Sequence, residues 1–97
     1  MRLTDEQIAS IRQAAQEAFG SDVRVTLFGS RVDDHKRGGD IDLLIQPSRI
    51  GQPLVCKLRF LGLLERDLGE RKIDVVVERA NDTRPIVRVA HETGVVL

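Results

Sequence analysis

Polar and apolar residues follow two different periods along the chain, and each change of period marks an expected element. Apolar residues recur every three or four positions over residues 8–19, which is the spacing of an amphipathic helix. Thr4 and Gln7 have the spacing of a capping box before this run, and Gly20 follows its end. The pattern predicts a first helix over residues 5–19.

Three later segments have the pattern of strands. Apolar and polar positions alternate over residues 23–28, which predicts a half-buried strand that ends at Phe28. Residues 41–45, IDLLI, are apolar on both faces after their first two positions, which predicts a second, more buried strand. Residues 72–77, KIDVVV, are mostly β-branched and predict a third.

Two further helices are expected in the second half of the chain. The leucine-rich residues 53–68 and the shorter segment 85–93 both begin with a proline and are followed by a glycine, as helices often are. Asp82 or Thr83 is expected to cap the last helix. The final residues, VVL, are assigned to no element.

The lengths of the connections predict the sheet topology. Eleven residues separate Phe28 from Asp40, which is short for a parallel crossover, whereas the helix-containing segment before the third strand is long enough for one. The first two strands should therefore be antiparallel, and the second and third parallel. We expect an α/β (α+β) fold in a single domain over residues 1–97, with a small mixed three-stranded sheet flanked by about four helices.

Composition argues against a nucleic-acid partner. The chain of 97 residues has 15 Lys and Arg against 15 Asp and Glu, so its formal net charge is zero. It has no Trp, no Tyr and three Phe. Nucleic-acid binding depends on an excess of positive charge and on aromatic side chains that stack on bases. The chain has no such excess and few aromatic side chains.

Cysteine usage and hydropathy indicate the setting. Cys56 is the single cysteine, and His35 and His91 are far apart in sequence, so we expect no internal disulfide and no standard structural zinc site. Cys56 is expected to be a small apolar residue on a helix. Residues 1–10 lack the apolar core of a signal peptide, and no run approaches the roughly 18 apolar residues of a membrane span. A cytoplasmic location is expected.

Carboxylates gather where two of the expected strands begin. Asp40 and Asp42 are two positions apart, so on a strand they face the same way with Cα atoms roughly 6.6 Å apart. Asp74 stands near the start of the neighbouring strand. Three carboxylates at one end of a sheet repel one another unless a cation lies between them. Mg²⁺ is the natural candidate, because it takes oxygen ligands from carboxylates and phosphates.

Gly29 and Ser30 provide the other half of a possible site. Glycine allows a close backbone approach, and the N–H groups and hydroxyl of a tight turn can bind phosphate oxygens. Arg31, Lys36 and Arg37 follow in the same loop. Each feature alone is common in solvated turns and strand ends. Their order along the chain predicts a site for a metal-bound nucleoside triphosphate.

This order resembles the DNA polymerase β nucleotidyltransferase superfamily, and within it the minimal nucleotidyltransferases that are often encoded beside a HEPN-domain protein. The signature is an apolar residue, Gly-Ser, a loop of about ten residues, Asp-apolar-Asp-apolar, and a third acid on a later strand. The matching segments here are Phe28-Gly29-Ser30, the nine-residue loop 31–39, Asp40-Ile41-Asp42-Leu43 and Ile73-Asp74-Val75.

The resemblance implies Mg²⁺-dependent transfer of a nucleoside monophosphate from ATP, with release of pyrophosphate. Asp40 and Asp42 would be metal ligands, and Asp74 the third carboxylate, which binds metal or activates the acceptor hydroxyl.

The resemblance also implies nucleotide contacts and a partner. Gly29 and Ser30 would hold the β and γ phosphates, and Arg31 would assist. A catalytic core that takes up the whole chain leaves the acceptor site to a partner, which in the minimal subfamily is a HEPN toxin. The chain would then be an antitoxin that adenylylates a tyrosine of its partner.

Two alternatives stay open at this point. The chain could be a non-catalytic antitoxin that masks a HEPN toxin by binding it. It could also be a small-molecule nucleotidyltransferase of the antibiotic-modifying kind, which fits the motif but not the length.

Overall fold

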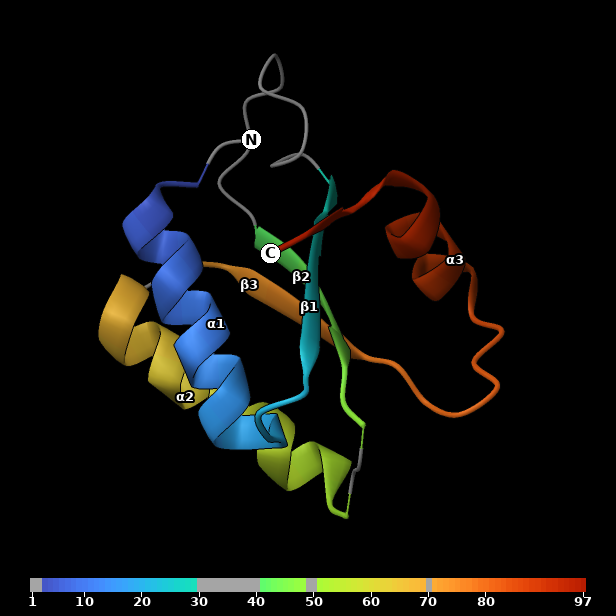
Figure 1. The fold of residues 1–97 in the computed structure, drawn as a ribbon, viewed down its shortest axis with the longest axis horizontal. Coiled ribbons are helices and arrows are strands. Elements are labelled where there is room, and N and C mark those ends of the chain that lie inside the picture. Colours follow the sequence, from blue (N-terminus) through green and yellow to red (C-terminus); the bar gives the residue numbers. More distant parts are fainter. Residues whose placement is uncertain (1–2, 30–40, 49–50, 70) are drawn as a thin grey trace.

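The computed structural model describes residues 3–29, 41–48, 51–69 and 71–97, and Figure 1 shows their arrangement. The elements are α1 (Asp5–Phe19), β1 (Arg24–Phe28), β2 (Ile41–Gln46), α2 (Pro53–Leu68), β3 (Ile73–Val77), α3 (Pro85–Thr93) and β4 (Val95–Val96). The mixed fold class is confirmed. The described residues hold three helices and four strands, which differs slightly from the expected three strands and about four helices.

The four strands form one sheet in the order β3-β2-β1-β4. β1 and β2 are antiparallel, and β2 and β3 are parallel, as the connection lengths predict. The additional strand, β4, pairs with β1 in antiparallel fashion. β3 therefore forms one outer edge of the described sheet and β4 the other.

The unpredicted strand β4 depends on a close approach at Gly94. A Cβ atom on this residue would lie 2.4 Å from the carbonyl oxygen of Ala90 and 2.4 Å from Cγ2 of Thr26. Only glycine fits this turn, which places Val95 opposite Leu27. A segment of two valines is too short to show the alternation that predicts a strand. Only its pairing with β1 makes it one.

The main core lies on the face of the sheet that α1 and α2 cover (Figure 1). The two helices meet at Phe19 and Phe60, whose rings pack edge to face with centroids 5.7 Å apart. The predicted capping box begins α1, since the Gln7 N–H donates to Thr4 Oγ1 at 3.1 Å. Cys56 lies on α2, partly buried against this core, as expected. The largest fully buried side chains are Ile11, Leu27, Ile41, Leu43, Leu44, Ile45, Phe60 and Leu64.

The opposite face of the sheet is packed by α3. Val87 and Ala90 of this helix form a second, smaller cluster with Phe28 and Leu44, and Val76 packs against it. Figure 1 shows α3 on the other side of the sheet from α1 and α2. Across the described helices, none is long and apolar enough to cross a membrane.

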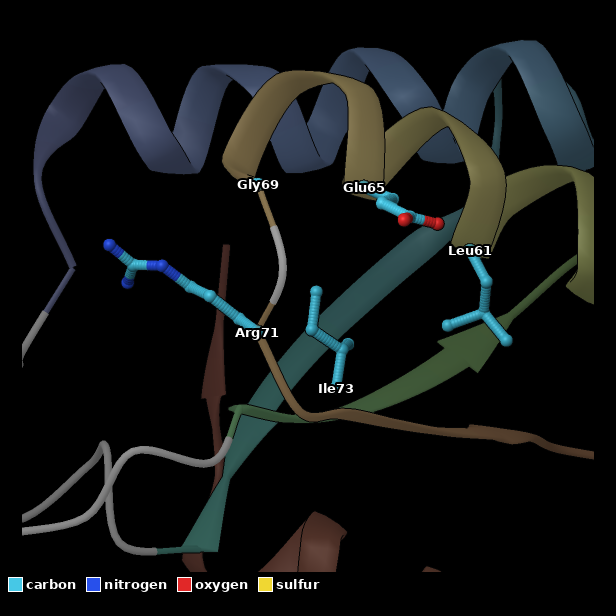
Figure 2. A pocket seen from close by; sticks show the side chains of 5 residues that line it. All are labelled: Leu61, Glu65, Gly69, Arg71 and Ile73. Carbon is cyan, nitrogen blue, oxygen red and sulfur yellow. The ribbon is translucent and has the colours of Figure 1, made fainter.

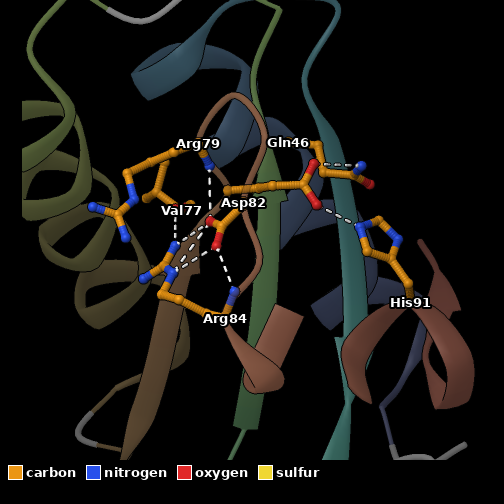
Figure 3. Close-up of polar contacts among 7 residues, drawn as sticks. Gln46, Val77, Arg79, Asp82, Arg84 and His91 are labelled. Atoms are coloured by element: carbon orange, nitrogen blue, oxygen red, sulfur yellow. Dashed lines mark hydrogen bonds and ion pairs between the residues drawn. The ribbon is translucent and has the colours of Figure 1, made fainter. Parts of the chain in front are cut away.

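The loop between β3 and α3 is closed by Asp82, which does not cap the helix. The N-cap of α3 is Arg84, and neither expected residue makes a side-chain cap bond there. The Asp82 carboxylate instead accepts hydrogen bonds from the N–H groups of Arg79 at 3.0 Å and Arg84 at 3.1 Å, and it pairs with the Arg84 guanidinium at 2.6 Å (Figure 3). The prediction of Asp82 or Thr83 as a cap is wrong because the carboxylate is occupied within the loop.

Candidate active site

Asp42 and Asp74 lie directly opposite each other on the parallel strands β2 and β3. They share the sheet face of Leu44 and Val76, since side chains alternate along a strand. Asp42 is partly buried and Asp74 is exposed. The pairing therefore brings together two of the three predicted carboxylates at one end of the sheet.

Gly29 lies against one of these acids. It follows β1, whose last residue, Phe28, is the partner of Asp42 in the antiparallel pairing. Gly29 has φ +80°, and a Cβ atom on it would lie 2.2 Å from Oδ2 of Asp42. A glycine is required here by both the backbone angle and the neighbouring carboxylate. The turn that is expected to bind phosphate and an acid that is expected to bind metal are thus in contact.

The other predicted site residues are placed by sequence alone. Ser30, Arg31 and Asp40 lie outside the described residues, and so do Lys36 and Arg37. Ser30 directly follows Gly29, and Asp40 directly precedes β2. Their proposed contacts stay predictions.

The third expected acid matters for the metal. Searched over the described ranges, the chain has no group of three or more histidine, cysteine, aspartate or glutamate side chains that could hold a metal ion. Asp42 and Asp74 are two oxygen donors of the type that Mg²⁺ prefers. Asp40, which would make the third, lies outside those ranges.

An apolar row separates the two acids from a second polar cluster on the same face. Beyond Leu44 and Val76, the side chain of Gln46 donates to Glu78 Oε2 at 3.0 Å. His91 Nε2 lies 2.5 Å from Glu78 Oε1 (Figure 3). Four residues of strand place this cluster about 13 Å from the acids. It joins α3 to the sheet, outside the candidate site.

Sequence reasoning missed this second cluster. Gln46 and Glu78 continue the alternation that begins with Asp42 and Asp74, which was a usable signal. The contact of His91 with Glu78 depends on how α3 packs on the sheet. The alternation of side chains along the strands does not predict that packing.

A family model described as a nucleotidyltransferase domain matches residues 8–96, which is well over half of the chain. The chain belongs to this family. The match spans β1, β2, β3 and the turn at Gly29. This nucleotidyltransferase domain is therefore of the polymerase β-like type, and its general activity is nucleotidyl transfer with a nucleotide substrate. No curated protein matches the chain.

Proposed function

We propose that this nucleotidyltransferase domain transfers AMP from ATP to a hydroxyl group of a protein partner, with Mg²⁺. The partner would be a HEPN-domain toxin, the acceptor one of its tyrosines, and the chain its antitoxin. The observation that carries the transferase site is the direct pairing of Asp42 with Asp74, with Gly29 against the Asp42 carboxylate.

The donor set fits a magnesium ion. Asp42 and Asp74 are neighbouring carboxylates on one sheet face, and Asp40 would add a third oxygen donor two residues before Asp42. These three residues would hold the ion. When bound, it neutralises charge on the triphosphate and makes the α-phosphorus more electrophilic.

The residues of the chain would position the nucleotide and accept a proton. The backbone N–H groups of the turn at Gly29, with Ser30 and Arg31, would bind the β and γ phosphates. Asp74 would take the proton of the acceptor hydroxyl. The acceptor oxygen forms a bond to the α-phosphorus while the bond from that phosphorus to the bridging oxygen breaks. Pyrophosphate leaves with the electron pair.

An accessible carboxylate supports a large acceptor. Asp74 is exposed, and it lies on the edge strand β3. A side chain of another protein can approach it from outside the sheet. The resemblance to the minimal nucleotidyltransferases supports a HEPN protein as that partner.

The test is co-expression with the HEPN-domain protein that we expect to be encoded by the neighbouring gene. Asp74→Asn is nearly isosteric, so the protein should fold and still bind its partner. Transfer should drop by on the order of a hundredfold or more. Mass spectrometry of the partner measures the added AMP, and a growth assay measures neutralisation. Asp67→Asn, an exposed acid paired with Arg66 on α2, is the control and should behave as wild type.

A second candidate function is masking of the toxin without catalysis. It is favoured by an exposed apolar patch on α2, where Leu54, Val55 and Leu58 are 67%, 57% and 60% exposed. Contiguous exposed apolar side chains are typical of protein-binding surfaces, and a HEPN partner would cover them. If Asp74→Asn still neutralises the toxin with no AMP adduct, masking is the function and the transferase proposal fails.

A further inference from the structure

β3 has one paired side and one outer side. It is one of the two edge strands of the described sheet. At its start the N–H of Ile41 donates to the carbonyl of Lys72 at 3.0 Å, and beyond its end the N–H of Glu78 donates to the carbonyl of Ile45 at 2.9 Å. Backbone groups alternate in direction along a strand. The even-numbered positions of residues 72–78 therefore face β2, and the odd-numbered positions face outward.

The outer side is closed at one end. Arg84 Nη2 donates to the outward carbonyl of Val77 at 2.8 Å (Figure 3). Ile73 and Val75 direct their N–H and C=O groups outward at the other end, on either side of Asp74. Such groups are a template for an added strand. The available stretch of edge is thus short and is centred on the carboxylate that would activate the acceptor.

We propose that an extended segment of the acceptor protein adds to β3 as a further strand and presents its hydroxyl side chain to Asp74. This inference rests on the proposed function and names the form in which the acceptor binds. In an antiparallel arrangement, the residue opposite Asp74 belongs to a non-hydrogen-bonded pair, in which side chains are closest. Its Cβ lies about 4.5–5.5 Å from that of Asp74. A hydroxyl side chain at this position lies on the same sheet face as the Asp74 carboxylate.

A pocket at the start of β3 can take the neighbouring side chain of such a segment. Its volume is about 460 Å³, and it is lined by Leu61, Glu65, Gly69, Arg71 and Ile73 (Figure 2). Ile73 has its side chain on the opposite face from Asp74, because the two residues are adjacent in the strand. The residues on either side of the acceptor residue would face this pocket.

The lining of the pocket indicates which side chain it would accept. Leu61 and Ile73 are apolar walls, and Glu65 and Arg71 add side chains of opposite charge (Figure 2). This combination favours an apolar side chain, or one with an apolar body and a polar tip. Main-chain bonds would provide affinity and the pocket would provide selectivity, as in other cases of strand addition.

The direct test uses peptides with the wild-type protein, Mg²⁺ and ATP. The probe is Lys-Gln-Val-Tyr-Val-Gln-Lys, in which the valines would bond to β3 and the tyrosine would face Asp74. N-methylation of both valines removes the edge-facing donors and should reduce the rate of AMP addition by on the order of tenfold or more. N-methylation of the tyrosine is the matched control, because its N–H faces away from β3, and should change the rate little.

A binding measurement separates the edge from the chemistry. In Asp42→Asn, which should not transfer AMP, the unmethylated peptide should still slow hydrogen exchange at the amides of Ile73 and Val75. Exchange at the Glu78 amide, already bonded to β2, should change little. No slowing at Ile73 and Val75, or equal modification of the two methylated peptides, would overturn the proposal. Slowing without any transfer by the wild type would leave edge binding standing and refute the proposed function.

A protein variant gives the complementary test. Ile73→Pro removes the first outward N–H, and proline is tolerated at the first position of a strand and on edges. It should abolish modification of the peptide but retain transfer to tyrosinamide, a small acceptor that needs no edge. Ile73→Ala keeps the N–H and shortens one apolar wall of the pocket, so it should modify tyrosinamide normally and the peptide more slowly than wild type but faster than Ile73→Pro. Equal activity of Ile73→Pro and Ile73→Ala on the peptide would contradict the inference.

Discussion

Gly29 and Asp42 are fitted to each other: a Cβ atom on the glycine would lie 2.2 Å from Oδ2 of the acid. The contact joins the turn after β1 to the start of β2. Any side chain at residue 29 would displace the carboxylate of Asp42, the residue that pairs with Asp74. The position of the acid therefore depends on the absence of a side chain one strand away.

The first prediction follows from this contact. Gly29→Ala should destabilise the protein by roughly 1–2 kcal/mol through its positive φ and should also weaken ATP binding, because Asp42 is displaced. Gly69 has a similar φ of +78°, and a Cβ atom on it would meet nothing within 4 Å. Gly69→Ala should share the loss of stability and keep the affinity. Thermal unfolding and calorimetry measure the two effects, and equal affinities would contradict the coupling.

A second prediction concerns the metal. ATP binding should require Mg²⁺, and Asp42→Asn should weaken it by on the order of tenfold or more, since one carboxylate charge is lost from the ion's ligands. Calorimetry with Mg²⁺ and with a chelator measures both. Glu92→Gln changes an exposed acid on α3 and should bind ATP normally. Equal affinity with and without metal would refute the assignment.

A third prediction concerns the hydroxyl that follows Gly29. Ser30→Ala should leave stability nearly unchanged, because a turn hydroxyl contributes little to the core. It should lose nucleotide affinity by on the order of 1–3 kcal/mol, the typical value of a hydrogen bond to a charged group. Titration of ATP into the variant tests this, and a normal affinity would remove Ser30 from the phosphate site.

A fourth prediction concerns pH and the loop that Asp82 closes. Hydrogen bonds from the Arg84 side chain, then from the Arg79 N–H, lower the pKa of Asp82 well below its ordinary value of 3.8. The folded state thus binds fewer protons than the unfolded state, so this contribution to stability is present above about pH 4 and is lost as the pH falls further.

Asp82→Asn tests that linkage. The variant should have a lower Tm than wild type at pH 7, and the difference should narrow as the pH falls from 4 toward 2. Asp67→Asn, whose ion pair with Arg66 lies at the surface, should change Tm little at pH 7. A Tm difference for Asp82→Asn that stays constant with pH would contradict the linkage.

Local signals located the helices well. The three described helices have the predicted bounds, because caps, prolines and glycines act within a few residues of each end. The strand β4 and the role of Asp82 were not predictable in this way. β4 depends on pairing with β1, which is distant in sequence. The role of Asp82 depends on which nearby donors bind its carboxylate.

The site was predictable in composition and only partly in geometry. Alternation places Asp42 and Asp74 on one side of their strands, but their direct pairing depends on the register between β2 and β3. The contact of Gly29 with Asp42 depends on the pairing of β1 with β2. A single strand contains no information on either register.

The alternation of buried and exposed side chains along β3 links the stability of the fold to the activity of the site. Val75 is buried in the main core, and Asp74 beside it is exposed. An insertion or deletion of one residue within the strand would exchange these environments, placing a charge in the core and a valine in solvent. Such a variant would be too unstable to fold, so it would not accumulate as a folded protein with an altered site. Length changes in the connection between Gly69 and Lys72 escape this penalty, so natural variation in chain length is expected to collect there.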